Sequence, residues 1–169
     1  MTNLYNPLNK TFNTTFFITN TNLFLITNSP TNQTLQEYIK ILHNNNITVV
    51  IRLCEKTYDE DFLKKNNIYF IDMFIEDGLY PSDIDITNFF NICSKYKNIA
   101  IHCKSGLGRA PLLIALHYII VEKKSSIETI SLIRDKIKSA FNMKQLNFIN
   151  NDISKKKNLY KDNSFCQIM

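Results

Sequence analysis

The sequence predicts an α/β domain with a mainly parallel central sheet and helices on both faces. Short runs of β-branched and aromatic residues alternate along the chain with apolar residues at helical spacing. Several of the β-branched runs show no apolar–polar alternation, which is typical of strands covered on both faces. The chain has 169 residues, the size of one domain. We expect a single domain over residues 1–154 and a basic tail over residues 155–169.

Five strands account for the predicted sheet. They are Phe16–Thr19, Leu23–Thr27, Ile47–Cys54, Ile68–Asp72 and Asn98–His102. The first two flank a polar Asn/Thr turn, and the other three are expected to be buried on both faces. In open sheets of this type, sites form at the carboxyl ends of strands. The end of the Asn98–His102 strand is therefore the place to look for chemistry.

The predicted helices follow from apolar spacing and from capping residues. Thr34 caps the first helix, and Pro111 is tolerated in the first turn of a buried helix over Ala110–Glu122. Ser125 and Glu128 form a capping box. The inward-facing residues are Leu35, Tyr38, Ile39 and Leu42; then Ile86, Phe89, Phe90 and Cys93; then Ile130, Ile133 and Ile137. A last helix is expected over Asn142–Ser154.

Composition narrows the classes of partner. The net charge of +5 favours anionic partners such as phosphorylated molecules and acidic lipids. Lys and Arg are scattered without a nucleic-acid-binding pattern, so nucleic acid is not expected. No secretory signal begins the chain, and the longest apolar run, Leu112–Val121, is too short to span a bilayer. The four cysteines have no metal-binding spacing, which predicts a reducing, cytoplasmic location without a metal or cofactor.

The segment after the third central strand combines a cysteine, two glycines and an arginine. It reads His102-Cys103-Lys104-Ser105-Gly106-Leu107-Gly108-Arg109-Ala110. Glycines between a strand and a helix allow backbone N–H groups to converge into an anion-binding nest at the positive end of the helix dipole. Such a nest favours a thiolate at Cys103, and the Arg109 guanidinium can hold two phosphate oxygens. We expect Lys104–Arg109 to bind a phosphate group above the Cys103 sulfur.

This loop resembles the signature loop of protein tyrosine phosphatases, and its ending Gly-Leu-Gly-Arg-Ala-Pro is similar to that of the phosphatase of regenerating liver (PRL) family. Further segments match the family in order: Pro30-Thr31-Asn32, Arg52-Leu53-Cys54-Glu55, Thr57-Tyr58-Asp59, Glu76-Asp77-Gly78, Lys144-Gln145-Leu146 and the terminal Cys-a-a-X box. The resemblance covers residue 14 to the end of the chain. It implies a dual-specificity-phosphatase-like fold and hydrolysis of phosphorylated proteins through a phosphocysteine intermediate on Cys103.

The resemblance also implies roles for individual residues. Asp77 matches the general acid, and Cys54 matches a cysteine that forms a disulfide with the nucleophile; the alternative for Cys54 is a small buried strand residue. Gln145 matches a residue that positions water. Ala110 replaces the Ser or Thr whose hydroxyl helps the thiolate to leave, as in PRL members, which predicts slow turnover. His102 is expected to order the loop by hydrogen bonding and not to act as a base.

The sequence departs from the PRL pattern around the expected acid. Met73-Phe74-Ile75 stands where the family usually has Trp-Pro-Phe, so the loop lacks its stiffening proline. The stretch between Asp77 and the Asn98–His102 strand is also a few residues shorter than in the family.

The chain ends in Cys166-Gln167-Ile168-Met169, which fits farnesylation of Cys166 followed by carboxyl methylation. One lipid gives marginal membrane binding, and Lys155, Lys156 and Lys157 would add attraction to anionic lipids. We therefore expect a peripheral protein on the cytosolic face of a membrane. The second cysteine that often precedes this box in the family is Phe165 in this chain.

Two alternatives to protein dephosphorylation stay open. Lys104 adds a charge beside the nucleophile, as in some phosphoinositide phosphatases, although a solvent-facing lysine explains it equally well. PRL proteins also dock on CBS-domain magnesium-transport mediators, which suggests a binding module switched by modification of Cys103. The resemblance further suggests a homotrimer on membranes.

Overall fold

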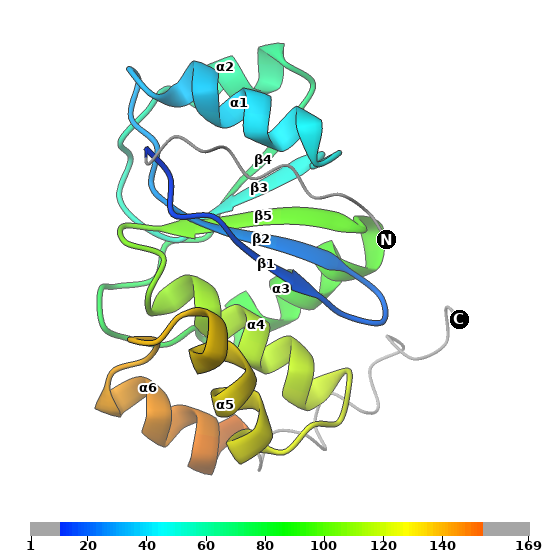
Figure 1. Cartoon of the computed structure of the whole chain (residues 1–169), viewed down its shortest axis with the longest axis vertical. Helices are drawn as coiled ribbons and strands as arrows, with labels where there is room; N and C mark the ends of the chain where they lie inside the picture. Colours follow the sequence, from blue (N-terminus) through cyan, green and yellow to red (C-terminus); the bar gives the residue numbers. More distant parts are fainter. Residues whose placement is uncertain (1–10, 154–169) are drawn as a thin grey trace.

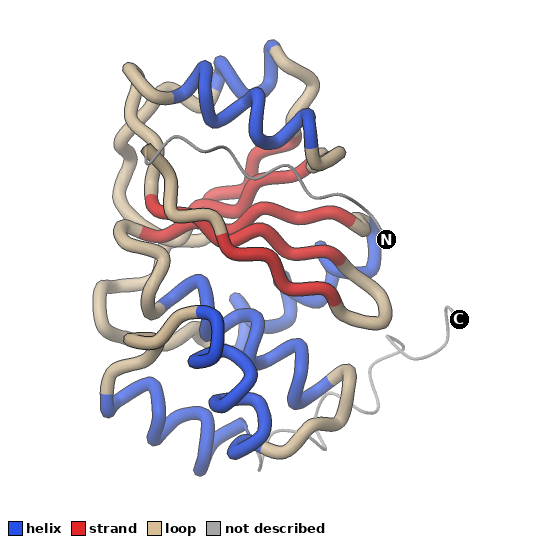
Figure 2. The backbone as a smooth tube through the Cα atoms, viewed as in Figure 1, coloured by secondary structure: helices blue, strands red, loops and turns tan. Residues whose placement is uncertain are grey.

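A five-stranded sheet divides the molecule into two helical layers (Figures 1 and 2). The computed structural model describes residues 11–153. The strands are β1 (Thr15–Ile18), β2 (Leu23–Asn28), β3 (Val49–Arg52), β4 (Tyr69–Asp72) and β5 (Asn98–Cys103), in the spatial order β1-β2-β5-β3-β4. β1 is antiparallel to β2, and every other neighbouring pair is parallel. The predicted mainly parallel sheet is confirmed.

Strand β5 lies at the centre of the sheet, between β2 and β3. Its register pairs His102 with Thr27 on one side and with Arg52 on the other. The parallel strands β2, β3 and β5 therefore end together, and Cys103 lies at the carboxyl edge that they share. This is the edge at which sites form in open parallel sheets.

Helices cover both faces of the sheet. α1 (Leu35–Asn44) and α2 (Asp61–Lys65) lie on one side, in the upper part of Figure 1. The other side carries α3 (Asp83–Lys95), α4 (Arg109–Ile120), α5 (Ser126–Lys136), α6 (Met143–Asn147) and the π-helical segment η1 (Phe148–Ile153).

Each face of the sheet belongs to a separate hydrophobic core, because successive strand residues point to opposite faces. In β5, Ile99 and Ile101 pack in the core under α3 and α4, whereas Ala100 packs in the core under α1. Every residue of α4 from Arg109 to Ile120 is buried, as predicted for this helix.

Three local predictions need correction. The Ile68–Asp72 run was expected to be buried on both faces, but β4 is an edge strand in which Tyr69 is 58% exposed and stacks on Tyr96. The helix expected over 142–154 is α6 followed by the π-helical turn η1, and Ser154 lies outside the described residues. Thr34 is the N-cap residue of α1, but its hydroxyl bonds the Thr31 carbonyl and not the helix.

Candidate active site

The loop that joins β5 to α4 depends on both of its glycines. Gly106 has a φ of +77°, and a Cβ there would lie 3.0 Å from the Thr27 carbonyl oxygen. Gly108 is the N-cap residue of α4, and a Cβ there would lie 3.1 Å from the Gln145 side-chain amide. The loop thus curls tightly between β2 and α6. Ser105, Leu107, Gly108 and Arg109, the first residue of α4, line the same cavity as Cys103, which is where an anion-binding nest is expected.

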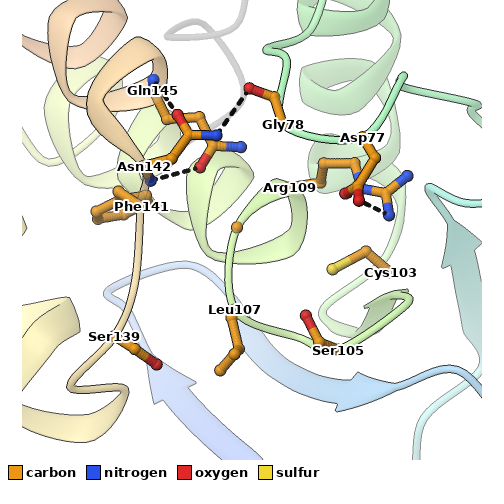
Figure 3. Close-up of a pocket in the computed structure, with 11 residues that line it drawn as sticks. Asp77, Gly78, Cys103, Ser105, Leu107, Arg109, Ser139, Phe141, Asn142 and Gln145 are labelled. Atoms are coloured by element: carbon orange, nitrogen blue, oxygen red, sulfur yellow. Dashed lines mark hydrogen bonds and ion pairs between the residues drawn. The ribbon is translucent and has the colours of Figure 1, made fainter.

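Arg109 is held in place by backbone carbonyl groups. Its side chain is 2% exposed, and its Nη1 donates to the Ile75 oxygen at 2.9 Å and to the Leu53 oxygen at 3.3 Å. Its Nη2 lies 3.0 Å from Oδ1 of Asp77, whose side chain is 75% exposed (Figure 3). The guanidinium is therefore fixed before any ligand arrives, with one edge paired to the carboxylate of the expected acid.

These groups open onto one cavity of about 220 Å³. It is lined by Asp77, Gly78, Cys103, Ser105, Leu107, Gly108, Arg109, Ser139, Phe141, Asn142 and Gln145 (Figure 3). The structure brings together the expected nucleophile, acid and phosphate-binding arginine. Two residues of the expected phosphate loop do not line it: the Lys104 side chain is exposed, and Gly106 packs against β2.

A buried polar cluster lies beside the nucleophile. The Leu53 N–H donates to the His102 carbonyl at 2.9 Å, which places Cys54 next to the end of β5. The His102 ring is fully buried, with Nε2 at 2.7 Å from the Tyr58 hydroxyl and Nδ1 at 3.9 Å from the Cys54 sulfur. Burial lowers the pKa of His102 to about 3, so its ring is neutral. The ring contacts join His102 to Tyr58 and Cys54, and its expected role in ordering the loop stays a prediction.

Cys54 and Cys103 are both free and buried. Desolvation raises the pKa of the Cys54 thiol. A raised pKa keeps Cys54 protonated at neutral pH, and the nucleophilic thiolate is the form that exchanges with oxidised sulfur.

Sequence reasoning missed two parts of the site. Asn142 lines the cavity and donates from Nδ2 to the Gly78 carbonyl at 2.9 Å. Tyr58 contacts His102 across 44 positions of sequence. The Asn-x-x-Gln pattern of residues 142–145 is a helix-capping signal in the sequence, but nothing local to it reports a contact with the loop that carries Asp77.

Comparisons with known proteins agree with this geometry. Residues 27–123 match the family model described as Tc-R-P, polymorphic toxin system, DSP-PTPase phosphatase. The chain is 39% identical over 132 residues to the PRL-1 phosphatase of Drosophila melanogaster, covering 75% of this chain and 74% of that protein. It is 37% identical over 145 residues to human protein tyrosine phosphatase type IVA 3, covering 82% and 83%.

This chain belongs to the PRL family of protein tyrosine phosphatases. A solved structure of a protein tyrosine phosphatase from Leishmania major has the same fold, with a TM-score of 0.71 and 29% identity over 78% of this chain and 88% of that one. As a PRL-type enzyme, the chain is a cysteine-dependent protein-tyrosine or dual-specificity phosphatase whose substrates are phosphorylated.

Two features are absent from residues 11–153. Within that part of this PRL-type chain, no helix is long and apolar enough to cross a membrane. The same residues contain no group of three or more His, Cys, Asp or Glu side chains that could hold a metal ion. The predicted lipid-bearing Cys166 and the lysines at 155–157 lie outside the described residues.

Proposed function

We propose that the chain hydrolyses phosphorylated proteins through a phosphocysteine on Cys103, with Arg109 binding the phosphoryl group and Asp77 acting as general acid. One observation carries this assignment. A buried Arg109, fixed by the Leu53 and Ile75 carbonyls, lies 3.0 Å from Asp77 and lines the same cavity as Cys103. Phosphate oxygens would occupy the space above the thiolate and draw one edge of the guanidinium away from Asp77.

The first step transfers the phosphoryl group to sulfur. The Cys103 thiolate attacks phosphorus, a P–S bond forms, and the P–O bond to the leaving group breaks. Asp77 donates its proton to the departing oxygen, and Arg109 with the loop N–H groups stabilises the charge on the equatorial oxygens. In the second step water attacks phosphorus, the Asp77 carboxylate accepts its proton, and the P–S bond breaks to return the thiolate and release phosphate.

We propose that the second step is slow because Ala110 offers no hydroxyl to the departing thiolate. Ala110 is fully buried at the start of α4, directly after Arg109. A methyl group there cannot donate a hydrogen bond as negative charge returns to sulfur. The phosphocysteine is then the species that accumulates during turnover.

Hydrolysis of 4-nitrophenyl phosphate under reducing conditions tests the assignment. We expect a burst followed by slow steady turnover, no product from Cys103→Ser, and at least a hundredfold lower kcat/KM from Asp77→Ala with a poorer leaving group, the order of magnitude of a lost general acid. Turnover that survives Cys103→Ser in folded protein would overturn the assignment.

Attachment to a membrane is the second part of the proposal. Cys166 stands in a terminal box that fits farnesylation and methylation, and Lys155, Lys156 and Lys157 provide charge for anionic lipids. In cells, the parent chain is expected in the membrane fraction and Cys166→Ser in the soluble fraction. An unmodified terminus in mass spectra of the membrane-bound protein would rule out the anchor.

We also propose that Cys54 forms a reversible disulfide with Cys103 that protects the nucleophile. Both thiols are buried, Cys103 at the end of β5 and Cys54 two residues after the end of the neighbouring strand β3. Mild peroxide should yield a linked Cys54–Cys103 peptide that dithiothreitol removes. Oxidation of Cys103 to sulfinic acid at the same rate in the parent and in Cys54→Ala would contradict this role.

A second candidate function is a binding module for a membrane partner of the CBS-domain magnesium-transport type. Slow turnover at Ala110 favours it, because a long-lived phosphocysteine would keep the pocket closed to a docking partner. Binding that is strong for unmodified protein and lost after phosphorylation or disulfide formation at Cys103 would support it.

Efficient release of phosphate from a phosphoinositide, with little from phosphotyrosine peptides, would instead favour a lipid substrate and a role for Lys104.

A further inference from the structure

The N-terminus of α6 is built from two amide side chains that cap the helix for each other. The Gln145 N–H donates to Oδ1 of Asn142 at 2.9 Å, and the Asn142 N–H donates to Oε1 of Gln145 at 3.1 Å. This reciprocal capping uses the oxygen atom of each amide. Both nitrogen atoms remain available to other partners.

Both nitrogen atoms donate to the acid loop, the segment of residues 73–80 that carries Asp77. Nδ2 of Asn142 lies 2.9 Å from the Gly78 oxygen (Figure 3). Nε2 of Gln145 lies 3.0 Å from the Leu79 oxygen. The two acceptors are consecutive carbonyl groups directly after Asp77. In each side-chain amide, the oxygen thus caps the helix and the nitrogen donates to the acid loop.

The acid loop has a second set of anchors on its other side. The Ile75 N–H donates to the Leu53 carbonyl at 3.1 Å, and the Ile75 carbonyl accepts from Arg109 at 2.9 Å. Asp77 lies between these contacts and the two amides of α6. No proline stiffens residues 73–77, so these hydrogen bonds define the loop conformation.

The segment just before α6 also contacts the phosphate loop. The Phe141 N–H donates to the Leu107 carbonyl at 3.2 Å, and Phe141 has a φ of +71°, an unfavourable conformation for a bulky residue. Gly78 also has a positive φ of +76°, and a Cβ there would lie 3.3 Å from Nδ2 of Asn142. The positive φ angles of Phe141 and Gly78 thus occur where α6 contacts the phosphate loop and the acid loop.

We propose that Asn142 and Gln145 are positioning residues that clamp the acid loop onto the phosphate loop and so hold Asp77 at the leaving oxygen. This inference rests on the proposed role of Asp77 as general acid. The clamp fixes the backbone directly after the acid, in a loop whose residues 73–77 include no proline. Misplacing an acid by about 1 Å can cost up to a hundredfold in rate.

Asn142→Ser removes the hydrogen bond to the Gly78 carbonyl and keeps a side-chain oxygen that caps α6. Serine is as good an N-cap as asparagine, but its hydroxyl is too short to reach Gly78. We expect kcat/KM to fall about tenfold more for phenyl phosphate than for 4-nitrophenyl phosphate, because the more basic leaving group depends more on the acid. In an Asp77→Asn background, Asn142→Ser should cost less than twofold further. Asn91→Ser, an exposed asparagine in α3, is the matched control and should leave the ratio of the two substrates unchanged.

Equal losses on the two substrates, or the same extra loss in the Asp77→Asn background, would show a merely structural role and overturn the clamp. Asn142→Asp, which keeps the capping oxygen and removes the donor, should repeat the pattern if Asn142→Ser proves unstable. Amide hydrogen exchange over residues 73–80 gives a readout that needs no activity: it should speed up in Asn142→Ser and not in Asn91→Ser. Unchanged exchange of residues 73–80 in Asn142→Ser also overturns the clamp. If the parent protein is inactive but its residues 73–80 exchange slowly and do so faster in Asn142→Ser, only the proposed function is contradicted.

Discussion

The buried guanidinium of Arg109 lines the cavity and contacts three oxygen-bearing groups of the protein. Two are backbone carbonyls, at Leu53 and Ile75, and the third is the Asp77 carboxylate. These contacts avoid the large cost of an unpaired buried charge and fix the direction in which the guanidinium faces. In the proposed mechanism, phosphate would replace Asp77 on one edge of this guanidinium, while the two carbonyls keep holding the other edge.

Ala110→Ser tests what limits the rate at the residue scale. A hydroxyl at this buried position beside the loop would stabilise the thiolate as the P–S bond breaks. We expect steady-state kcat to rise several-fold and the burst amplitude to fall, whereas kcat/KM, which reports formation of the phosphocysteine, changes little. Stopped-flow release of 4-nitrophenol separates these quantities. An unchanged kcat with a normal burst would show that another feature slows the second step.

Single residues were predictable where their role depends on neighbours in sequence. Cys103 and Arg109 flank one loop, so their meeting follows from a strand–loop–helix pattern. Asn142 and Tyr58 could not be found in this way, because their partners Gly78 and His102 lie on distant segments. Asp77 needed the PRL resemblance, since an Asp-Gly pair by itself indicates only a turn.

At the scale of elements, an ion pair ties edge strand β4 to β3. Arg52 is 3% exposed and makes two hydrogen bonds to Asp72, from Nε at 3.1 Å and from Nη2 at 2.7 Å. The guanidinium also lies over the Phe70 ring, 4.8 Å from its centroid. Apart from the backbone ladder, this cluster fastens the outermost strand of the sheet, from which the acid loop departs.

Asp72→Asn should therefore lower the free energy of unfolding by about 1–2 kcal/mol, because Arg52 keeps its charge in a buried place with a weaker acceptor. Denaturant unfolding measures this change. Asp61→Asn is the control, since it removes a pair with Lys64 in which both side chains are more than half exposed, and such pairs contribute well under 1 kcal/mol. Equal losses in the two variants would contradict the role assigned to the β4 anchor.

Element boundaries were largely predictable, but the place of an element in the fold was not. β-branched spacing located β3, β4 and β5 within a few residues, because this pattern depends on local burial. It could not show that β4 lies at the edge, since an edge strand next to an aromatic partner such as Tyr96 has the same apolar composition. Strand order is a property of the whole chain.

At the scale of the whole molecule, two buried histidines make stability depend on pH. Burial lowers the pKa of His102 to about 3 and that of His117 to about 4. In the unfolded chain both have the ordinary histidine pKa of about 6.5, so below that pH the unfolded state binds protons that the folded state does not. The free energy of unfolding must then fall as the pH is lowered from about 6.5 towards 4.

Each histidine should remove roughly 2 kcal/mol between pH 7 and pH 5. His117→Gln replaces a ring that faces Thr21 and Asn22 far from the cavity, so it should cancel about half of this loss. Denaturant titrations of both proteins at the two pH values give the comparison. Parallel pH dependence in the parent and in His117→Gln would contradict the assignment of a neutral buried His117.

Whether Cys103 carries the phosphoryl group during turnover can be measured by intact-mass spectrometry of rapidly quenched protein. With excess aryl phosphate under reducing conditions, we expect the intact protein to gain the mass of one phosphoryl group, and a digest of the quenched protein to place it on the peptide that contains Cys103. The adduct should diminish in Ala110→Ser and be absent in Cys103→Ser. Turnover by the parent protein without an adduct at any quench time, or an adduct that persists in Cys103→Ser, would contradict it.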